Sequence, residues 1–149
     1  MRKVLTVFVA LSMLLIAGQV MAGESVMTPK SIDGVTVVDA KWVKERMGEV
    51  IVYDVRKKGD FVERHITGAI SAPYKEKSGK SADFDSSKDN MKMDRYPSYK
   101  HIPVVVYCNG PKCWKSYKTA VMLVRNGYSK VHWLRDGFPG WLDKGYPTE

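Results

Sequence analysis

VVVYCNGPKC, residues 104–113, is the stretch of sequence that decides the fold of this 149-residue chain. Residues 102–107 form an apolar run of strand length, with Pro103 near its start, and such a run is typical of a strand buried on both faces of a parallel sheet. The run ends directly at Cys108, and the Asn-Gly-Pro that follows predicts a turn. Helical spacing then begins, so the segment predicts a strand, a turn and a helix, with a thiol at the carboxyl end of the strand.

The rest of the chain repeats this alternation of strands and helices. Short apolar or β-branched runs predict further strands at 35–38, 50–55 and 131–134. Helices are predicted at 39–48, 60–64, 114–126 and 140–144. Residues 67–74 are interpreted as a loop and strand end, and the polar residues 75–101 as a long surface loop with at most one helical turn. The alternation predicts an α/β fold with a central, mainly parallel sheet flanked by helices.

The first 22 residues predict a cleaved secretory signal. Arg2 and Lys3 precede an apolar run, and short residues at Val20 and Ala22 suit a signal peptidase that cleaves after Ala22. A membrane anchor is the alternative, but the run is shorter than the ~20 apolar residues that span a bilayer. We therefore expect a single domain at 23–149, periplasmic or secreted, with no membrane attachment after cleavage.

The charge balance is basic, with 24 Lys and Arg against 16 Asp and Glu and a formal net charge of +8. The lysines are scattered and the chain is predicted to be exported, so we expect a solvated surface rather than a nucleic-acid partner. His101 and His132 have no partner at metal-ligand spacing, so no metal site and no cofactor are predicted.

Cys108 is the predicted nucleophile. Ligands of open α/β sheets bind at the carboxyl ends of the strands. A thiol there faces turn amides and the positive end of the next helix, and both favour the nucleophilic thiolate. The same amides would hold the terminal sulfur of a persulfide, whereas an inert core thiol is the alternative. The predicted persulfide-binding loop comprises Asn109, Gly110, Lys112, Cys113, Trp114, Lys115 and Ser116.

Two further features of this segment bear on the chemistry. Lys112, Lys115 and Lys118 are expected to add positive potential at the mouth of the site and to attract small sulfur anions. Cys113 has three open roles: it packs, it forms a reversible disulfide with Cys108, or it resolves an oxidised or persulfidated Cys108.

Three stretches, in order along nearly all of residues 23–149, resemble signatures of the rhodanese family. The first joins VYDVR at 52–56 to DFVERHITGAI at 60–70. The second is the strand, Cys108 and the following helix, and the third joins GFPGW at 137–141 to GYP at 145–147. The resemblance implies a rhodanese-like three-layer fold with a catalytic cysteine that opens the active-site loop.

The resemblance also implies a two-step sulfur transfer. Cys108 would attack the outer sulfur of a donor such as thiosulfate or polysulfide and become a persulfide, and a thiophilic acceptor such as cyanide or a protein thiol would then take that sulfur. Asp54 and Arg56 resemble a couple that supports the loop. His65 resembles the family's motif histidine, for which we expect a hydrogen-bonding role rather than acid–base catalysis.

Three other functions remain open. A thiol–disulfide oxidoreductase would use Cys108 and Cys113, although their spacing is C-x4-C rather than C-x2-C. A cysteine-dependent phosphatase needs an arginine in a C-x5-R pattern, and this chain has Trp114 there. A non-catalytic sulfur carrier needs the same amide cradle as an enzyme, so the residues do not separate these two functions.

Overall fold

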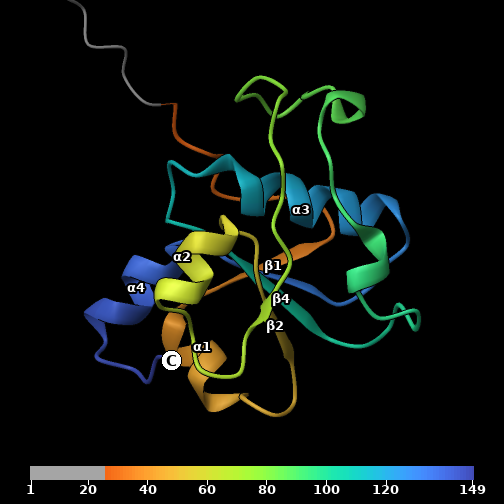
Figure 1. The fold of residues 1–149 in the computed structure, drawn as a ribbon. Helices are drawn as coiled ribbons and strands as arrows, with labels where there is room; N and C mark the ends of the chain where they lie inside the picture. Colours follow the sequence, from red (N-terminus) through yellow and green to blue (C-terminus); the bar gives the residue numbers. More distant parts are fainter. Residues whose placement is uncertain (1–25) are drawn as a thin grey trace, which may run out of the picture.

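The computed structural model describes residues 26–149; the predicted signal at 1–22 lies outside the described residues. A five-stranded sheet in the order β1-β5-β4-β2-β3 forms the centre, and each neighbouring pair is parallel. The strands are β1 (Val35–Val38), β2 (Ile51–Asp54), β3 (Ile70–Ser71), β4 (Val104–Tyr107) and β5 (Val131–Leu134). The predicted parallel sheet is therefore confirmed (Figure 1).

Helices cover both faces of this sheet. They are α1 (Ala40–Glu45), α2 (Lys58–Glu63), α3 (Trp114–Arg125) and α4 (Gly137–Asp143). The longest of them, α3, packs with one face of the sheet in one hydrophobic cluster, whereas α1 and α4 pack together against the other face in a second cluster (Figure 1). The three-layer α/β architecture is confirmed. None of the helices within residues 26–149 has the length and apolar character needed to cross a bilayer.

The central strand β4 shows why its apolar run is unbroken. Val104 and Val106 belong to the cluster beneath α3, and Val105 and Tyr107 belong to the cluster beneath α1 and α4. Successive side chains of a strand point to opposite faces, so a strand covered on both sides needs apolar residues at every position. All four residues are buried, as the sequence pattern predicts.

Element boundaries differ from the predicted ones by a few residues. The first helix has the predicted cap, because the Asp39 carboxylate accepts a hydrogen bond from the Trp42 amide at 2.8 Å, but it ends at Glu45 rather than Gly48. The helix predicted at 60–64 occupies Lys58–Glu63. The last helix begins at Gly137 rather than Gly140, because Pro139 lies in its first turn, where a missing amide hydrogen removes no helical bond.

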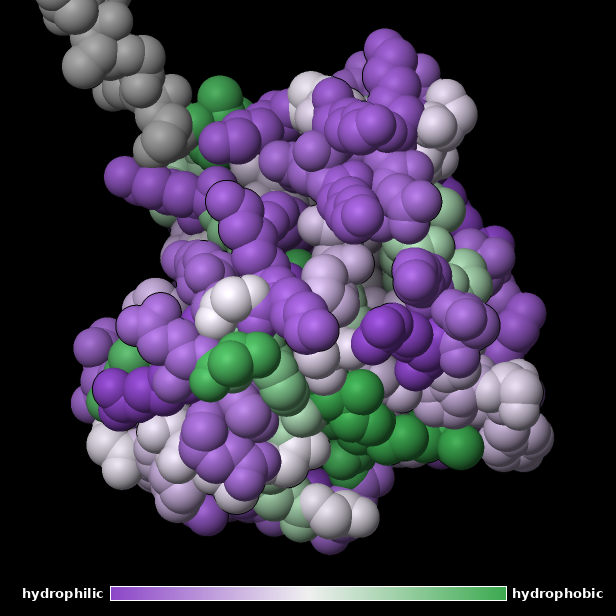
Figure 2. All heavy atoms as spheres, viewed as in Figure 1, coloured by the Kyte–Doolittle hydropathy of each residue, from purple (hydrophilic) through white to green (hydrophobic). Residues whose placement is uncertain are grey.

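Residues 75–101 form the predicted long strand-free connection, with two short 3-10 helices (Ser86–Lys88 and Met93–Arg95) instead of at most one turn. Its outer surface is mostly hydrophilic (Figure 2). It is not purely a surface loop, however, because Phe84 and Tyr96 are buried in the cluster beneath α3. Apolar side chains this far apart show no periodicity, so the sequence pattern missed their contribution to the core.

Candidate active site

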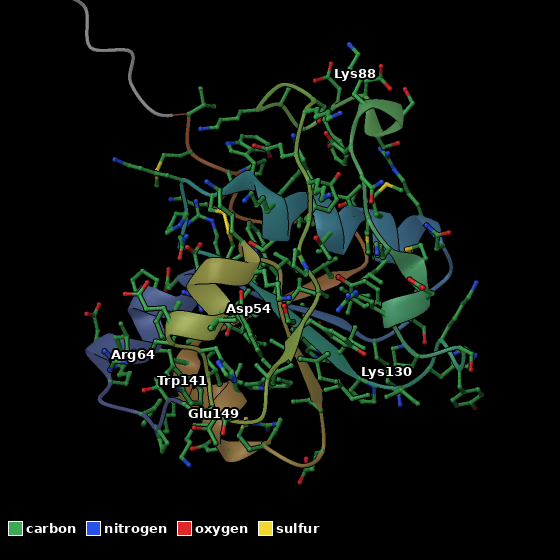
Figure 3. The ribbon with its side chains drawn as sticks, in the orientation of Figure 1. Asp54, Arg64, Lys88, Lys130, Trp141 and Glu149 are labelled. Atoms are coloured by element: carbon green, nitrogen blue, oxygen red, sulfur yellow. A yellow bond between two sulfur atoms is a disulfide. The ribbon has the colours of Figure 1, made fainter. Side chains whose placement is uncertain are left out.

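The site forms where β4 ends. Cys108 follows Tyr107 and is only 1 % exposed, and its sulfur is bonded to that of Cys113, with the two Cα atoms 6.2 Å apart. Disulfide sulfurs are drawn in yellow in Figure 3. Cys113 is the N-cap residue of α3 and is partly exposed. Of the three roles left open for Cys113, the disulfide is the one present here.

Backbone contacts hold the turn between the two cysteines. Gly110 has a φ of +98°, a left-handed conformation that favours glycine, and its carbonyl accepts from the Cys113 amide at 3.0 Å. The Phe138 amide donates to the Cys108 carbonyl at 2.8 Å. A Cβ atom at Gly137 would overlap that same carbonyl, so the start of α4 must be a glycine for the turn to pack there.

Residues 26–29, here called the N-terminal strap, lie against the same turn. Both the amide and the hydroxyl of Thr28 donate to the Pro111 carbonyl, at 2.9 and 2.8 Å. The Trp114 indole donates to a strap carbonyl at 2.8 Å, and the Arg135 guanidinium donates to two more at 2.8 and 3.0 Å. No local sequence pattern predicts this strap, because the residues that it joins are distant in the chain.

The turn carries several amide hydrogens that are not used for its own structure. Within residues 26–149, the amides of Asn109, Gly110 and Lys112 donate to no acceptor. The first amides of α3 likewise lack intrahelical acceptors, as in any helix, and the first turn of α3 holds no acidic residue. This end of the site therefore contains uncommitted donors and the partial positive charge of a helix start, and both favour an anion.

Three residues grouped with the loop by sequence are helical. Trp114, Lys115 and Ser116 form the first turn of α3. Trp114 is buried edge-to-face against Tyr117, with the ring centroids 5.1 Å apart. The buried Ser116 hydroxyl accepts from the Trp133 indole at 3.0 Å, so it supports the helix.

The prediction that Lys118 lies at the mouth of the site is wrong. Its side chain is fully buried, with Nζ 2.9 Å from Glu76 and 2.7 Å from the Ser78 hydroxyl. The connection at 75–101 covers this part of α3 and supplies both partners. Because these residues are about 40 positions away in the chain, the helical position of Lys118 did not indicate its burial. Lys112 remains exposed and Lys115 partly exposed.

A cavity of about 580 Å³ opens next to the first turn of α3. It is here called the basic cavity, because six cationic side chains line it and Glu76 is its one acidic lining residue. The cations are Lys57, Lys58, Lys75, Lys92, Arg95 and Lys115. Four of them follow the carboxyl ends of β2, β3 and β4, the end of the sheet where Cys108 lies. Lys92 and Arg95 come from the connection at 75–101.

Asp54 and Arg56 form a buried ion pair at the end of β2, close to the centre of the molecule (Figure 3). Arg56 Nη2 lies 2.6 Å from Asp54 Oδ2, and the Tyr107 hydroxyl donates to the same oxygen at 2.6 Å. Burial, and then the Asp54 charge, raise the pKa of Tyr107, so its hydroxyl stays protonated as a donor. Arg56 and Asn109 line one cavity, so the Arg56 side chain lies next to the turn at residues 108–113.

His65 lies away from the sulfur atoms. Its Nδ1 is 2.8 Å from the Phe61 carbonyl, its ring stacks on that of Phe61, and its Nε2 is 3.4 Å from a Glu149 carboxylate oxygen. The residue joins the end of α2 to the last residue of the chain. Its contacts fit the hydrogen-bonding role expected for it.

The fold and the turn define a class: a three-layer α/β domain with a cysteine at the carboxyl end of its central strand. The rhodanese-like domain family matches residues 39–144, and the chain belongs to this family.

The chain is also similar to individual proteins. The HTH-type transcriptional regulator Rv0324 of Mycobacterium tuberculosis is 28% identical over 106 residues, which are 71% of this chain and 40% of that protein. The chain thus spans about two-fifths of that relative's length. Among solved structures, the BH2092 protein from Bacillus halodurans has a TM-score of 0.60 at 24% identity and covers 76% of each chain. Thiosulfate sulfurtransferase from Pseudomonas aeruginosa has a TM-score of 0.56 at 21% identity over 77% of this chain and 20% of that one, a likeness of fold.

Proposed function

We propose that the protein is an exported sulfurtransferase that carries sulfur as a persulfide on Cys108. The observation that carries this proposal is the position of Cys108 between the end of β4 and the start of α3, in a turn with uncommitted amide hydrogens. The thiosulfate sulfurtransferase among the structural neighbours supports the same chemistry. The predicted signal at 1–22 supports a periplasmic or secreted location for a single domain at 23–149.

The first half-reaction begins once the disulfide is reduced. The Cys108 thiolate attacks the outer sulfur of thiosulfate, the sulfur–sulfur bond of the donor breaks, and sulfite leaves with the electron pair. The Cys108 persulfide that remains is anionic, and the turn amides and the amino end of α3 stabilise it. This displacement needs no cofactor or metal, because the thiolate itself supplies the nucleophile.

The basic cavity supports small sulfur anions as the donors. Cationic clefts concentrate anions, so thiosulfate or polysulfide would be enriched beside Lys115, which follows Cys113 by two residues. In the second half-reaction, a nucleophilic acceptor attacks the outer sulfur of the persulfide and the Cys108 thiolate leaves. The proposed acceptors are cyanide in an assay and a small or protein thiol in the cell, with no nucleic acid and no membrane as partners.

A pre-reduced, reductant-free protein tests the proposal when thiosulfate is added and sulfite is measured. We expect about one sulfite per chain from the wild type and from Cys113→Ser, and none from Cys108→Ser. Cys113→Ser should gain the mass of one sulfur atom and lose it to cyanide as thiocyanate. Absence of sulfite from all three proteins would exclude sulfur transfer from thiosulfate. A stable adduct that cyanide and thiols do not discharge would indicate a sulfur carrier.

The Cys108–Cys113 disulfide favours a second candidate, a thiol–disulfide oxidoreductase. In that function the reduced pair would reduce a disulfide of another protein, and both cysteines would be required. Insulin reduction that is lost in Cys108→Ser and in Cys113→Ser, together with no sulfite release from thiosulfate, would support this candidate over the first.

A further inference from the structure

We propose that Cys113 completes a second activity of the same site, the reductive release of sulfide from the Cys108 persulfide. This inference rests on the proposed persulfide chemistry. It adds a product, because a simple sulfurtransferase passes the sulfur atom to an acceptor and releases no sulfide of its own. The protein's own dithiol is the reductant.

The disulfide identifies which sulfur atom Cys113 reaches. Its sulfur bonds Cys108 Sγ while the turn keeps its hydrogen bonds to α4 and to the N-terminal strap. In a persulfide, Cys108 Sγ is the inner sulfur. Cys113 is thus placed by the folded turn to attack the inner atom rather than the outer one, with the two Cα atoms 6.2 Å apart.

The surroundings of Cys113 favour its thiolate. It is the N-cap residue of the 12-residue α3, where the helix dipole is positive, and Lys112 and Lys115 flank it in sequence. No acidic residue occupies the first turn of that helix, so no carboxylate there opposes the negative charge. Such conditions produce a nucleophilic cysteine at neutral pH.

Burial gives Cys113 an advantage over external nucleophiles. Cys108 is only 1 % exposed and Cys113 is partly exposed. An external thiol must enter the site to reach the inner sulfur, whereas Cys113 is already in the site, and a held nucleophile reacts far faster than a free one.

The step balances in atoms and electrons. The outer sulfur of the anionic persulfide takes up one proton from water, and the Cys113 thiolate forms a bond to Cys108 Sγ. The bond from that atom to the outer sulfur breaks, and the outer sulfur leaves with the electron pair as hydrosulfide. The sulfane sulfur is reduced by two electrons, and the two cysteines are oxidised to the disulfide seen in the structure. The sum for one turnover is that thiosulfate and the protein dithiol give sulfite, hydrosulfide, the protein disulfide and one proton.

A further turnover requires an external dithiol, small or protein. Its thiolate would attack the more exposed Cys113 sulfur, so that Cys108 leaves as the thiolate that the turn amides stabilise, and its second thiol would then release Cys113. The product of the sulfide-releasing step is therefore also the resting form from which the site is reactivated.

The test is a single turnover without free reductant. Pre-reduced protein receives one equivalent of thiosulfate, and sulfite, sulfide and intact mass are measured together. The wild type should release about one sulfite and one sulfide per chain and lose the mass of two hydrogen atoms. Cys113→Ser and Cys113→Ala should release sulfite but no sulfide and keep one extra sulfur atom, and Cys108→Ser should release neither.

Two outcomes would overturn the inference and leave the proposed function intact. In the first, the wild type releases sulfite but no sulfide and keeps one extra sulfur atom. Transfer of the outer sulfur from Cys108 to Cys113 would give this result. The other is equal sulfide from the wild type and from both Cys113 variants. Absence of sulfite from every protein would instead remove the proposed function itself, so the two failures are distinguishable.

Discussion

At the scale of single residues, a buried ion pair supports the end of the strand that precedes Cys108. Asp54 is fully buried and Arg56 is 5 % exposed, and each would be costly without the other. The Tyr107 hydroxyl and the Arg64 carbonyl complete their hydrogen bonds. Since Tyr107 directly precedes Cys108, this pair links the end of β2 to the strand that leads to Cys108.

Asp54→Asn should therefore lower the free energy of unfolding by about 3–5 kcal/mol, the usual cost of leaving a buried charge unpaired. Glu45→Gln is the matched control, because Glu45 forms only exposed pairs at 3.8 Å and its loss should cost less than about 1 kcal/mol. Urea unfolding followed by tryptophan fluorescence measures both. Equal effects of the two substitutions would contradict the structural role assigned to Asp54.

The lowered pKa of Asp89 should make the free energy of unfolding depend on pH. Its side chain is 2 % exposed; burial raises its pKa, but hydrogen bonds from Ser78, the Lys77 amide and the Tyr74 hydroxyl together lower it to about 2. A carboxylate with a depressed folded-state pKa contributes stability above its unfolded pKa and loses it as the pH falls through the folded value. The contribution of Asp89, about 2 kcal/mol, should therefore disappear between about pH 4 and pH 2.

Unfolding measured from pH 5 to pH 2 should show a shallower decline for Asp89→Asn than for the wild type, and a lower stability of that variant at pH 5. Asp94→Asn is the control in the same connection, because Asp94 is exposed. Parallel pH profiles for the wild type and Asp89→Asn would show that this carboxylate does not titrate as expected.

At the scale of elements, the start of α4 and the turn at residues 108–113 form one packed unit. Gly137 combines a φ of +63° with a position directly against the Cys108 carbonyl and the Gly110 nitrogen. The rhodanese-type GFPGW motif thus has a steric reason for its first glycine. Any side chain at this position would displace either α4 or the turn that contains Cys108.

Gly137→Ala should cost about 1–2 kcal/mol for the left-handed backbone and a further 1–3 kcal/mol for overpacking. Gly145→Ala is a close control, since Gly145 has a φ of +65° but a Cβ added there would meet no atom within 4 Å, so only the first cost applies. Thermal unfolding compares them. Sulfite release should fall only in Gly137→Ala, and an equal loss of stability in both variants would refute the packing argument.

At the scale of the whole molecule, the basic cavity assembles segments from three parts of the chain. Lysines that follow β2 and β3 meet Lys115 of α3 and the cations near residues 92–95. The scattered lysines of the sequence are therefore not uniformly spread in space. Their field is the feature proposed to bring sulfur anions to the edge of the sheet that holds Cys108.

Lys58→Gln and Lys115→Gln should each raise the KM for thiosulfate roughly twofold to fivefold, as about 0.4–1 kcal/mol per exposed charge implies. Added salt should raise the wild-type KM more than that of the double variant. Lys130→Gln is the control, because Lys130 precedes β5 and lies at the amino ends of the strands, away from Cys108 at their carboxyl ends (Figure 3). A KM that none of these substitutions changes would separate the cavity from donor binding.

Local patterns in the chain were sufficient for the order of strands and helices, the buried central strand, the position of Cys108 at its end and the family. Each of these depends on residues close together in sequence, where alternation, turn residues and capping act directly. Folding decided the rest: the pairing of Cys108 with Cys113, the strap bonded to the turn across 83 residues, the burial of Lys118 and the basic cavity. These features depend on which distant segments the sheet brings together, and contacts between distant residues leave no periodic mark on the chain.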